Sequence, residues 1–228
     1  MDLVTEQLQE SGYVVIPDVV GIEEIREIAR FVDDHVSAGA GTRRLIERRW
    51  CGDLADRLSR DTRLSEALPI DARPVQCTFF VKSKTNNWLV SLHQDLSIPV
   101  AERVDNPECC GWSEKEGELF VQAPVSILAD VVAVRVHLDE CDERNGALRV
   151  VPGSHRLGRL TAAGAKRVRD ELGETSVIVP RGGVMVMKPL LLHASSKVSS
   201  NSMRRVLHFV FGPTRLPCGL HWPALVSS

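Results

Sequence analysis

The sequence lacks a long apolar run, a sustained basic run and any repeat or low-complexity tract. Its longest apolar stretches, such as residues 131–136, are far shorter than the roughly 20 residues that cross a bilayer. The formal net charge is -2, and the basic residues form only short pairs such as Arg43-Arg44. These absences argue against a membrane or nucleic-acid partner.

Cysteine spacing gives no functional signal. The six cysteines are scattered at positions 51, 77, 109, 110, 141 and 218, and no two have the C-x-x-C spacing of a zinc site. The N-terminal residues include acidic side chains and no apolar segment of the kind found in signal peptides. We therefore expect a cytoplasmic protein with free thiols.

Length and composition favour one soluble domain. The chain has 228 residues, of which 43% are hydrophobic and 25% charged. We expect a single domain over residues 1–228, with a helical N-terminal part, 1–70, packed on a β core, 75–213. Apolar residues at helical spacing predict helices over 3–9, 21–36 and 52–67, a strand over 13–17 and a turn over 38–42.

From about residue 75 the pattern changes to short β-rich runs. They cover residues 76–81, 88–93, 131–138, 147–151, 176–179, 183–187 and 204–211, and one helix is predicted over 160–172. Turn signals such as Asn145-Gly146 and Pro152-Gly153 separate these runs. Many short, evenly spaced strands predict a mainly β sandwich or barrel with helices outside it.

The segment His93-Gln94-Asp95 is the first candidate for chemistry. Residues two apart on a strand share a face, so an imidazole and a carboxylate here can converge on one metal ion. Two histidines and one carboxylate suit non-haem iron(II), because they leave coordination positions open. The same spacing recurs at His137-Leu138-Asp139, so it is weak evidence by itself.

Two further residues strengthen the case. His193 follows the apolar run 190–192, and we expect it at the end of a strand, before a small, hydroxyl-rich loop. Arg204 begins a β-rich run eleven residues later. A guanidinium near a metal can bind a carboxylate through two parallel hydrogen bonds.

With these residues in this order, the sequence resembles the phytanoyl-CoA dioxygenase family of iron(II)- and 2-oxoglutarate-dependent oxygenases. The matching segments are LHQD at 92–95, NGALRVVPGSHRLG at 145–158, GGVMVMKPLLLHASS at 182–196 and RRVLHFVFGP at 204–213. The resemblance covers about residues 75–213, and GYVVIP with the helix after it matches the family's N-terminal part. It implies a double-stranded β-helix (jelly-roll) core with iron at one mouth.

The resemblance also implies roles for individual residues. His93, Asp95 and His193 would hold Fe(II), and Arg204 would hold 2-oxoglutarate, which is decarboxylated as O2 is consumed. Ser195 matches a family position whose hydroxyl meets a 2-oxoglutarate carboxylate. Related halogenases have a small residue in place of the iron-binding carboxylate, so Asp95 favours hydroxylation or desaturation.

Three other residues are candidate ligand contacts. Gln76 and Lys82 share a strand face with Thr78 and would touch cosubstrate or substrate, or else be a core glutamine and a solvated lysine. Arg135 shares a face with His137 and Asp139, and many relatives have tryptophan at its position. If that face looks into the barrel, Arg135 and His137 line the pocket, with Arg135 paired either to a ligand carboxylate or to Asp139.

The remaining expectations are structural. Asp139 should order the turn 139–145, and Arg205 should be a surface or interface residue. His155 should order its loop. His208 shares the Arg204 face and should be a packed core histidine, or else be buried near the cosubstrate. The tryptophans are either pocket walls or core, and they are Trp88, Trp112 and Trp222.

The sequence leaves the substrate and the oligomeric state open. We expect a small-molecule substrate, with substrate or lid loops over 100–125 and 157–175. Two other classes of function remain: a non-catalytic or sensory jelly-roll protein that binds metal, and a cupin-type metalloenzyme that does not use 2-oxoglutarate.

Overall fold

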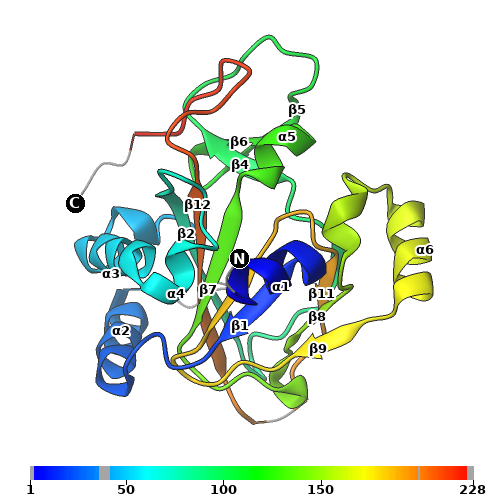
Figure 1. Ribbon diagram of the computed structural model, residues 1–228. Coiled ribbons are helices and arrows are strands. Elements are labelled where there is room, and N and C mark those ends of the chain that lie inside the picture. Colours follow the sequence, from blue (N-terminus) through cyan, green and yellow to red (C-terminus); the bar gives the residue numbers. More distant parts are fainter. Residues whose placement is uncertain (1–2, 36–41, 200, 225–228) are drawn as a thin grey trace.

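A computed structural model describes residues 3–35, 42–199 and 201–224, and its strands form three antiparallel sheets. The first sheet has the order β1 (Tyr13–Ile16), β10 (Val184–Met187), β7 (Val132–His137), β12 (Arg204–Gly212), β2 (Arg73–Lys82). The second has the order β3 (Val90–His93), β11 (His193–Ser195), β8 (Leu148–Val150), β9 (Thr175–Val177). The fold is mainly β, with a jelly-roll core, as predicted (Figure 1).

The first sheet has two differently used faces, because side chains alternate along each strand. On the outer face, Val134, Leu207 and Phe209 belong to a large apolar cluster. On the inner face, Arg135, Arg204 and His208 line a cavity. Every residue of β7 is buried, since both faces of this central strand are covered.

Helices cover the outer face. They are α1 (Leu3–Ser11), α2 (Ile22–His35), α3 (Arg49–Arg60) and α4 (Thr62–Ser65), and all four precede β2 in sequence (Figure 1). Leu8, Ile25, Leu54 and Leu64 bury their side chains in the same apolar cluster as the sheet. None of the helices in the described ranges is both long enough and apolar enough to cross a membrane.

The N-terminal helices agree with the sequence predictions except in one place. The helix predicted over 52–67 is two helices, because the backbone of Asp61 is extended and its carboxylate accepts a hydrogen bond from Arg63 N to cap the second. Of the turn predicted over 38–42, residues 38–41 lie outside the described residues.

The segment predicted as a substrate loop, 100–125, is largely folded. A third sheet has the order β4 (Ser97–Val100), β6 (Glu118–Gln122), β5 (Cys110–Lys115), and the short helix α5 (Val125–Ala129) follows it. Positive φ angles at Glu116 and Gly117 make the tight hairpin turn that joins β5 to β6. The loop prediction was wrong because β5 is mostly exposed and irregularly paired, so it has no clean apolar alternation.

Near the second sheet the structure corrects one sequence prediction, the strand before His193, and confirms another, the helix over 160–172. The apolar run 190–192 is a turn, closed by a hydrogen bond from Leu191 N to Lys188 O, and His193 begins β11 rather than ending a strand. Burial of this turn in the protein interior explains why it reads as a strand. The helix predicted over 160–172 is confirmed as α6 (Ala162–Leu172), which follows the 3-10 turn Ser154–Leu157.

Arg205 corrects two sequence predictions. It is 9% exposed rather than on the surface, and its guanidinium bonds Asp139 through Nε and Nη2, both at 2.9 Å. Nη1 bonds Asp33 at 2.8 Å, which ties the sheet to α2. Asp139 therefore anchors Arg205, and Asp142 orders the turn that had been assigned to Asp139, by accepting from Arg144 N and Asn145 N.

We expect Arg205→Ala to lower the free energy of unfolding by about 3 kcal/mol, because two carboxylates lose their shared partner. Urea denaturation followed by circular dichroism measures this. Arg49→Ala is the control, since Arg49 is 90% exposed and 4.0 Å from Asp53, and it should cost less than about 0.5 kcal/mol. Equal midpoints for the two variants would contradict the structural role of Arg205.

Candidate metal and cosubstrate site

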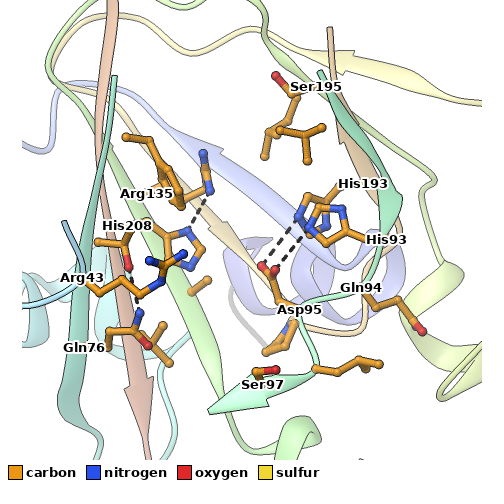
Figure 2. Close-up of a pocket in the computed structure, with 18 of the residues that line it drawn as sticks. Arg43, Gln76, His93, Gln94, Asp95, Ser97, Arg135, His193, Ser195 and His208 are labelled. Atoms are coloured by element: carbon orange, nitrogen blue, oxygen red, sulfur yellow. Dashed lines mark hydrogen bonds and ion pairs between the residues drawn. The ribbon is translucent and has the colours of Figure 1, made fainter. Parts of the chain in front are cut away.

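A cavity of about 430 Å³ lies between the inner face of the first sheet and the second sheet. Its lining contains His93, Asp95 and His193 on one side. Figure 2 shows Arg135, His208 and Gln76 facing them from the other side. The third sheet, which the sequence did not predict, closes part of the wall with residues such as Ser97, Ile98 and Phe120.

His93, Asp95 and His193 form a compact cluster. Their ligand atoms all lie within 4.8 Å of one another. Asp95 places one carboxylate oxygen 3.5 Å from His93 Nε2 and the other 3.6 Å from His193 Nε2 (Figure 2). His93 and His193 pair across β3 and β11, so antiparallel register holds the two imidazoles side by side.

The histidine tautomers fit a metal site. Each Nδ1 lies next to a backbone carbonyl oxygen, at 2.8 Å from Ser91 O for His93 and 2.9 Å from Leu191 O for His193. These contacts place the proton on Nδ1, so that both Nε2 lone pairs point at the shared centre. Two neutral imidazoles and one carboxylate are the donor set of non-haem iron(II) sites.

The electrostatics of the cluster keep the carboxylate ionised. Burial opposes ionisation, but the neighbouring histidines hold the pKa of Asp95 far below its usual range. Burial lowers the pKa of His93, but the neighbouring Asp95 outweighs it, so the pKa of this imidazole is raised. At His193 burial dominates and lowers the pKa. Protons and a metal ion therefore compete for the His93 nitrogen.

Gln94 fixes the loop between the two ligands, a role that the sequence did not indicate. Its amide nitrogen donates to Gly158 O at 2.8 Å and to Leu190 O at 2.7 Å. Its amide oxygen accepts from Leu160 N at 2.9 Å. Asp95 N also donates to Pro189 O at 2.9 Å, so the backbone at the ligands is held from two sides. A buried glutamine has no distinguishing signal in a single sequence.

His137 does not join the cluster, as expected for the second His-x-Asp pair. It is 3% exposed, and neither ring nitrogen has a hydrogen-bond partner in the part of the chain that the structure describes. Burial, followed by the charge of Arg135, lowers the pKa of His137 well below its ordinary value, so the ring is neutral. The expectation that His137 lines the pocket was wrong, since it is absent from the cavity wall.

A polar group built around one carbonyl lies elsewhere in the cavity. The Gly146 carbonyl oxygen accepts from Arg204 Nη1 and from Ser195 Oγ, the latter at 2.8 Å. Lys82 Nζ donates to Ser195 Oγ at 2.7 Å and to Ser196 O at 2.9 Å. Gly146 has a φ of +82°, and a Cβ there would lie 2.8 Å from Ser196 O, so this turn requires glycine.

The cations of this group are deeply buried. Lys82 is 1% exposed and Arg204 3%, and they pair across β2 and β12. The solvated-lysine alternative for Lys82 is therefore wrong. Burial and the neighbouring Arg204 lower the pKa of Lys82 to about 8. Arg204 Nε is buried and has no hydrogen-bond partner in the described ranges.

Arg135 lines the cavity and is not paired with Asp139, whose carboxylate bonds Arg205. Its Nη1 lies 2.7 Å from His208 Nδ1, and its guanidinium carbon lies 5.6 Å from the centre of the Phe80 ring. His208 is buried and forms part of the cavity wall, so of the two alternatives for this residue the packed core is wrong.

The other predicted residues separate into wall and core. Gln76 lines the cavity and donates to Thr78 Oγ1 at 2.8 Å, and the Trp88 ring lies 5.2 Å from Lys82 Nζ. Trp112 and Trp222 instead pack in an apolar cluster beside the third sheet. His155 Nε2 lies 3.1 Å from Gln9 O and joins its loop to α1. The sequence reading missed Arg43, Phe80 and Lys115 in the wall.

Comparison with known families matches residues 8–206 to the phytanoyl-CoA dioxygenase family. The chain belongs to this family. Among curated proteins, none matches the chain.

Solved structures at low identity show the same fold. AviO1 from Streptomyces viridochromogenes Tue57 is 20% identical, with a TM-score of 0.60 over 94% of this chain and 95% of that one. HygX from Streptomyces hygroscopicus, solved with nickel and 2-oxoglutarate bound, is 21% identical, with a TM-score of 0.61 over 93% and 88%. SnoN, a non-haem alpha-ketoglutarate-dependent epimerase from nogalamycin biosynthesis, is 15% identical, with a TM-score of 0.65 over 92% and 80%.

We expect His93→Ala, Asp95→Ala and His193→Ala each to abolish high-affinity binding of Fe(II), measured anaerobically by calorimetry. His137→Ala is the matched control, because it removes a buried imidazole from the other His-x-Asp pair and should leave metal affinity unchanged. Iron binding that depended on His137 and not on His93 would contradict this assignment.

Proposed function

We propose that this protein is an Fe(II)- and 2-oxoglutarate-dependent dioxygenase that hydroxylates or desaturates a small molecule. The observation that carries the proposal is one cavity with a His93, Asp95, His193 cluster on one wall and a buried, partly unpaired Arg204 on another. Family membership and the nickel and 2-oxoglutarate bound in HygX support it.

In this proposal His93 Nε2, His193 Nε2 and one Asp95 oxygen hold the iron. Bound iron with 2-oxoglutarate would activate O2, with release of succinate and CO2, so that the substrate is oxidised. The backbone carbonyls at Nδ1 keep both imidazoles in the metal-binding tautomer. Gln94 limits movement of Asp95 relative to the histidines.

Arg204, Lys82 and Ser195 are the proposed contacts of the distal carboxylate of 2-oxoglutarate. All three side chains line the cavity. The cations Lys82 and Arg204 donate to neutral oxygens and not to a carboxylate among the described residues, so their positive charge is largely uncompensated. The unpaired Arg204 Nε offers a donor to an incoming carboxylate oxygen. Gln76 is a weaker candidate contact, because Thr78 already accepts from its amide.

Retention of Asp95 supports oxidation of a C–H bond rather than halogenation. A carboxylate ligand occupies the coordination position that a halide would need. The fold itself does not select among the other reactions, since a structure with the same fold is named an epimerase. Succinate release that depends on Fe(II) and 2-oxoglutarate would separate the proposal from a metal-binding sensor and from a cupin-type enzyme that does not use 2-oxoglutarate.

We expect Arg204→Ala to raise the dissociation constant for 2-oxoglutarate about tenfold or more. Hydrogen bonds to charged groups contribute roughly 1.5–3 kcal/mol each. Titration of 2-oxoglutarate into the Ni(II)-loaded protein measures this. Lys115→Ala removes another cation of the same cavity wall and should change the constant less than about threefold. Equal losses in both variants would indicate general electrostatic attraction rather than a specific contact.

The affinity for 2-oxoglutarate should fall as the pH rises through about 8. The pKa of Lys82 is lowered to about 8, first by burial and then by Arg204 and Arg135. Above this pH the lysine is neutral in the ligand-free protein and attracts the carboxylate less. Lys82→Met should bind 2-oxoglutarate more weakly than the unmodified protein at neutral pH, and its affinity should no longer fall as the pH rises through about 8. Titrations of 2-oxoglutarate at several pH values measure both effects. An unchanged pH profile in Lys82→Met would exclude Lys82 as the titrating group.

A further inference from the structure

The charges that line the cavity are strongly unequal. Arg43, Lys82, Lys115, Arg135 and Arg204 are cationic, and Asp95 is the one carboxylate in the lining that the described residues form. The two positive charges of iron(II) and the two negative charges of the 2-oxoglutarate carboxylates would cancel each other. Arg43 is compensated separately, because Glu116 accepts from its Nη1 at 2.8 Å. Loading the site as proposed therefore leaves positive charge uncompensated.

Arg135 is a buried cation that Asp95, across the cavity, compensates only in part. It is 5% exposed, and its guanidinium makes one hydrogen bond within the described residues, from Nη1 to His208 Nδ1. Its Nε is buried without a partner. A guanidinium in a protein interior is costly unless an anion pairs with it. The Nε and Nη2 edge is the side that a carboxylate can bind with two parallel hydrogen bonds.

His208 completes this position as a neutral donor. Its Nδ1 accepts from Arg135, so the ring proton lies on Nε2 and is free for another acceptor. Burial and Arg135 lower the pKa of His208 to about 3, which keeps the ring neutral. The edge of the Phe80 ring packs against His208 and holds the pair in place.

The Arg135–His208 pair occupies a different level of the sheet from the proposed 2-oxoglutarate contacts. Arg135 is opposite His208 across β7 and β12, whereas Arg204 is opposite Lys82 across β12 and β2. His208 is four residues beyond Arg204, which corresponds to about 14 Å of strand. Figure 2 shows Arg135 and His208 facing Asp95 and the two histidines across the cavity, where a substrate must approach the metal.

We propose that the Arg135–His208 pair binds a carboxylate of the organic substrate, so that this oxygenase acts on an acid. The inference rests on the proposed function and deepens it. An anion at this position compensates the remaining buried charge and anchors the substrate beside the metal ligands. A neutral analogue of the substrate would leave the guanidinium unpaired and bind weakly.

Benzoate and benzamide are suitable probes, because they share a shape and differ in charge. Titrated into protein loaded with Ni(II) and excess 2-oxoglutarate, benzoate should bind about tenfold or more tightly than benzamide. Arg135→Gln should reduce this preference to within about twofold and change the 2-oxoglutarate constant less than about threefold. Arg43→Gln, which removes a cation already paired with Glu116, should keep the preference.

Each contrary result has a distinct meaning. A benzoate preference that persists in Arg135→Gln, or that is absent from the unmodified protein, overturns the inference. A loss of 2-oxoglutarate binding in Arg135→Gln as large as in Arg204→Ala also overturns it, because Arg135 would then belong to the cosubstrate. The 2-oxoglutarate titration of the unmodified protein is done before the benzoate titration. If the protein binds no 2-oxoglutarate, the proposed function fails, which is a different outcome from a missing benzoate preference.

Stability gives a second readout that needs no ligand. Arg135→Met removes an uncompensated buried charge, so the ligand-free variant should melt at the same temperature as the unmodified protein or higher. Arg205→Met removes a guanidinium bonded to two carboxylates and should melt lower. A comparable loss in Arg135→Met, or failure of that variant to fold, would show that Arg135 has a structural role and would overturn the inference.

Discussion

The pairing of β12 with β2 on one side and β7 on the other is the constraint on which the site depends. It places Arg204 and His208 toward the cavity, while Arg205 and Leu207 between them face the helices. A shift of one residue would exchange these two sets. Two adjacent arginines therefore have different environments, one unpaired at Nε inside the cavity and one bonded to Asp139 and Asp33.

The same alternation produces a conflict between stability and binding. The outer face of the first sheet joins α1, α2 and α3 in a continuous apolar cluster, which stabilises the fold. The inner face instead carries the buried cations Lys82, Arg135 and Arg204, and among the described residues none of the three has a hydrogen-bonded carboxylate. Buried cations of this kind destabilise the ligand-free protein, because they lose hydration. A bound anion offsets this desolvation free energy by pairing with them. The cavity is accordingly preorganised for negatively charged ligands.

The candidate metal cluster of His93, Asp95 and His193 and the rest of the cavity wall contribute different properties. His93 and His193 pair in register on the second sheet, and backbone carbonyls fix their orientation, so this part of the site is rigid. The facing wall comes from the first and third sheets and supplies charge and shape through residues such as Arg135 and Phe120. Structures of this fold include one named an epimerase and one named a carbocyclase, so the fold alone does not select a reaction.

Much of the fold and the centre of the site followed from the sequence. Short β-rich apolar runs located eight strands of the two main sheets, all but β11, because burial on at least one face favours such runs. The spacing of His93, Asp95, His193 and Arg204, together with the family resemblance, identified residues that the fold brings into one cavity. Local hydrogen-bonding and turn chemistry also placed Asn145-Gly146 correctly at a turn.

Tertiary structure decided what depends on contacts between distant segments. The third sheet went unrecognised because β5 is half exposed and irregularly paired, while β4 and β6 bury consecutive residues, so none of the three shows the alternation that marks a strand. The partner of Asp139 was decided by β12, and it is Arg205 rather than Arg135. Gln94 and His208 acquire their roles only when the sheets pack, since a buried polar side chain has no local sequence signal. The sequence thus determined which residues could meet, and packing determined which of them were left with an unpaired charge.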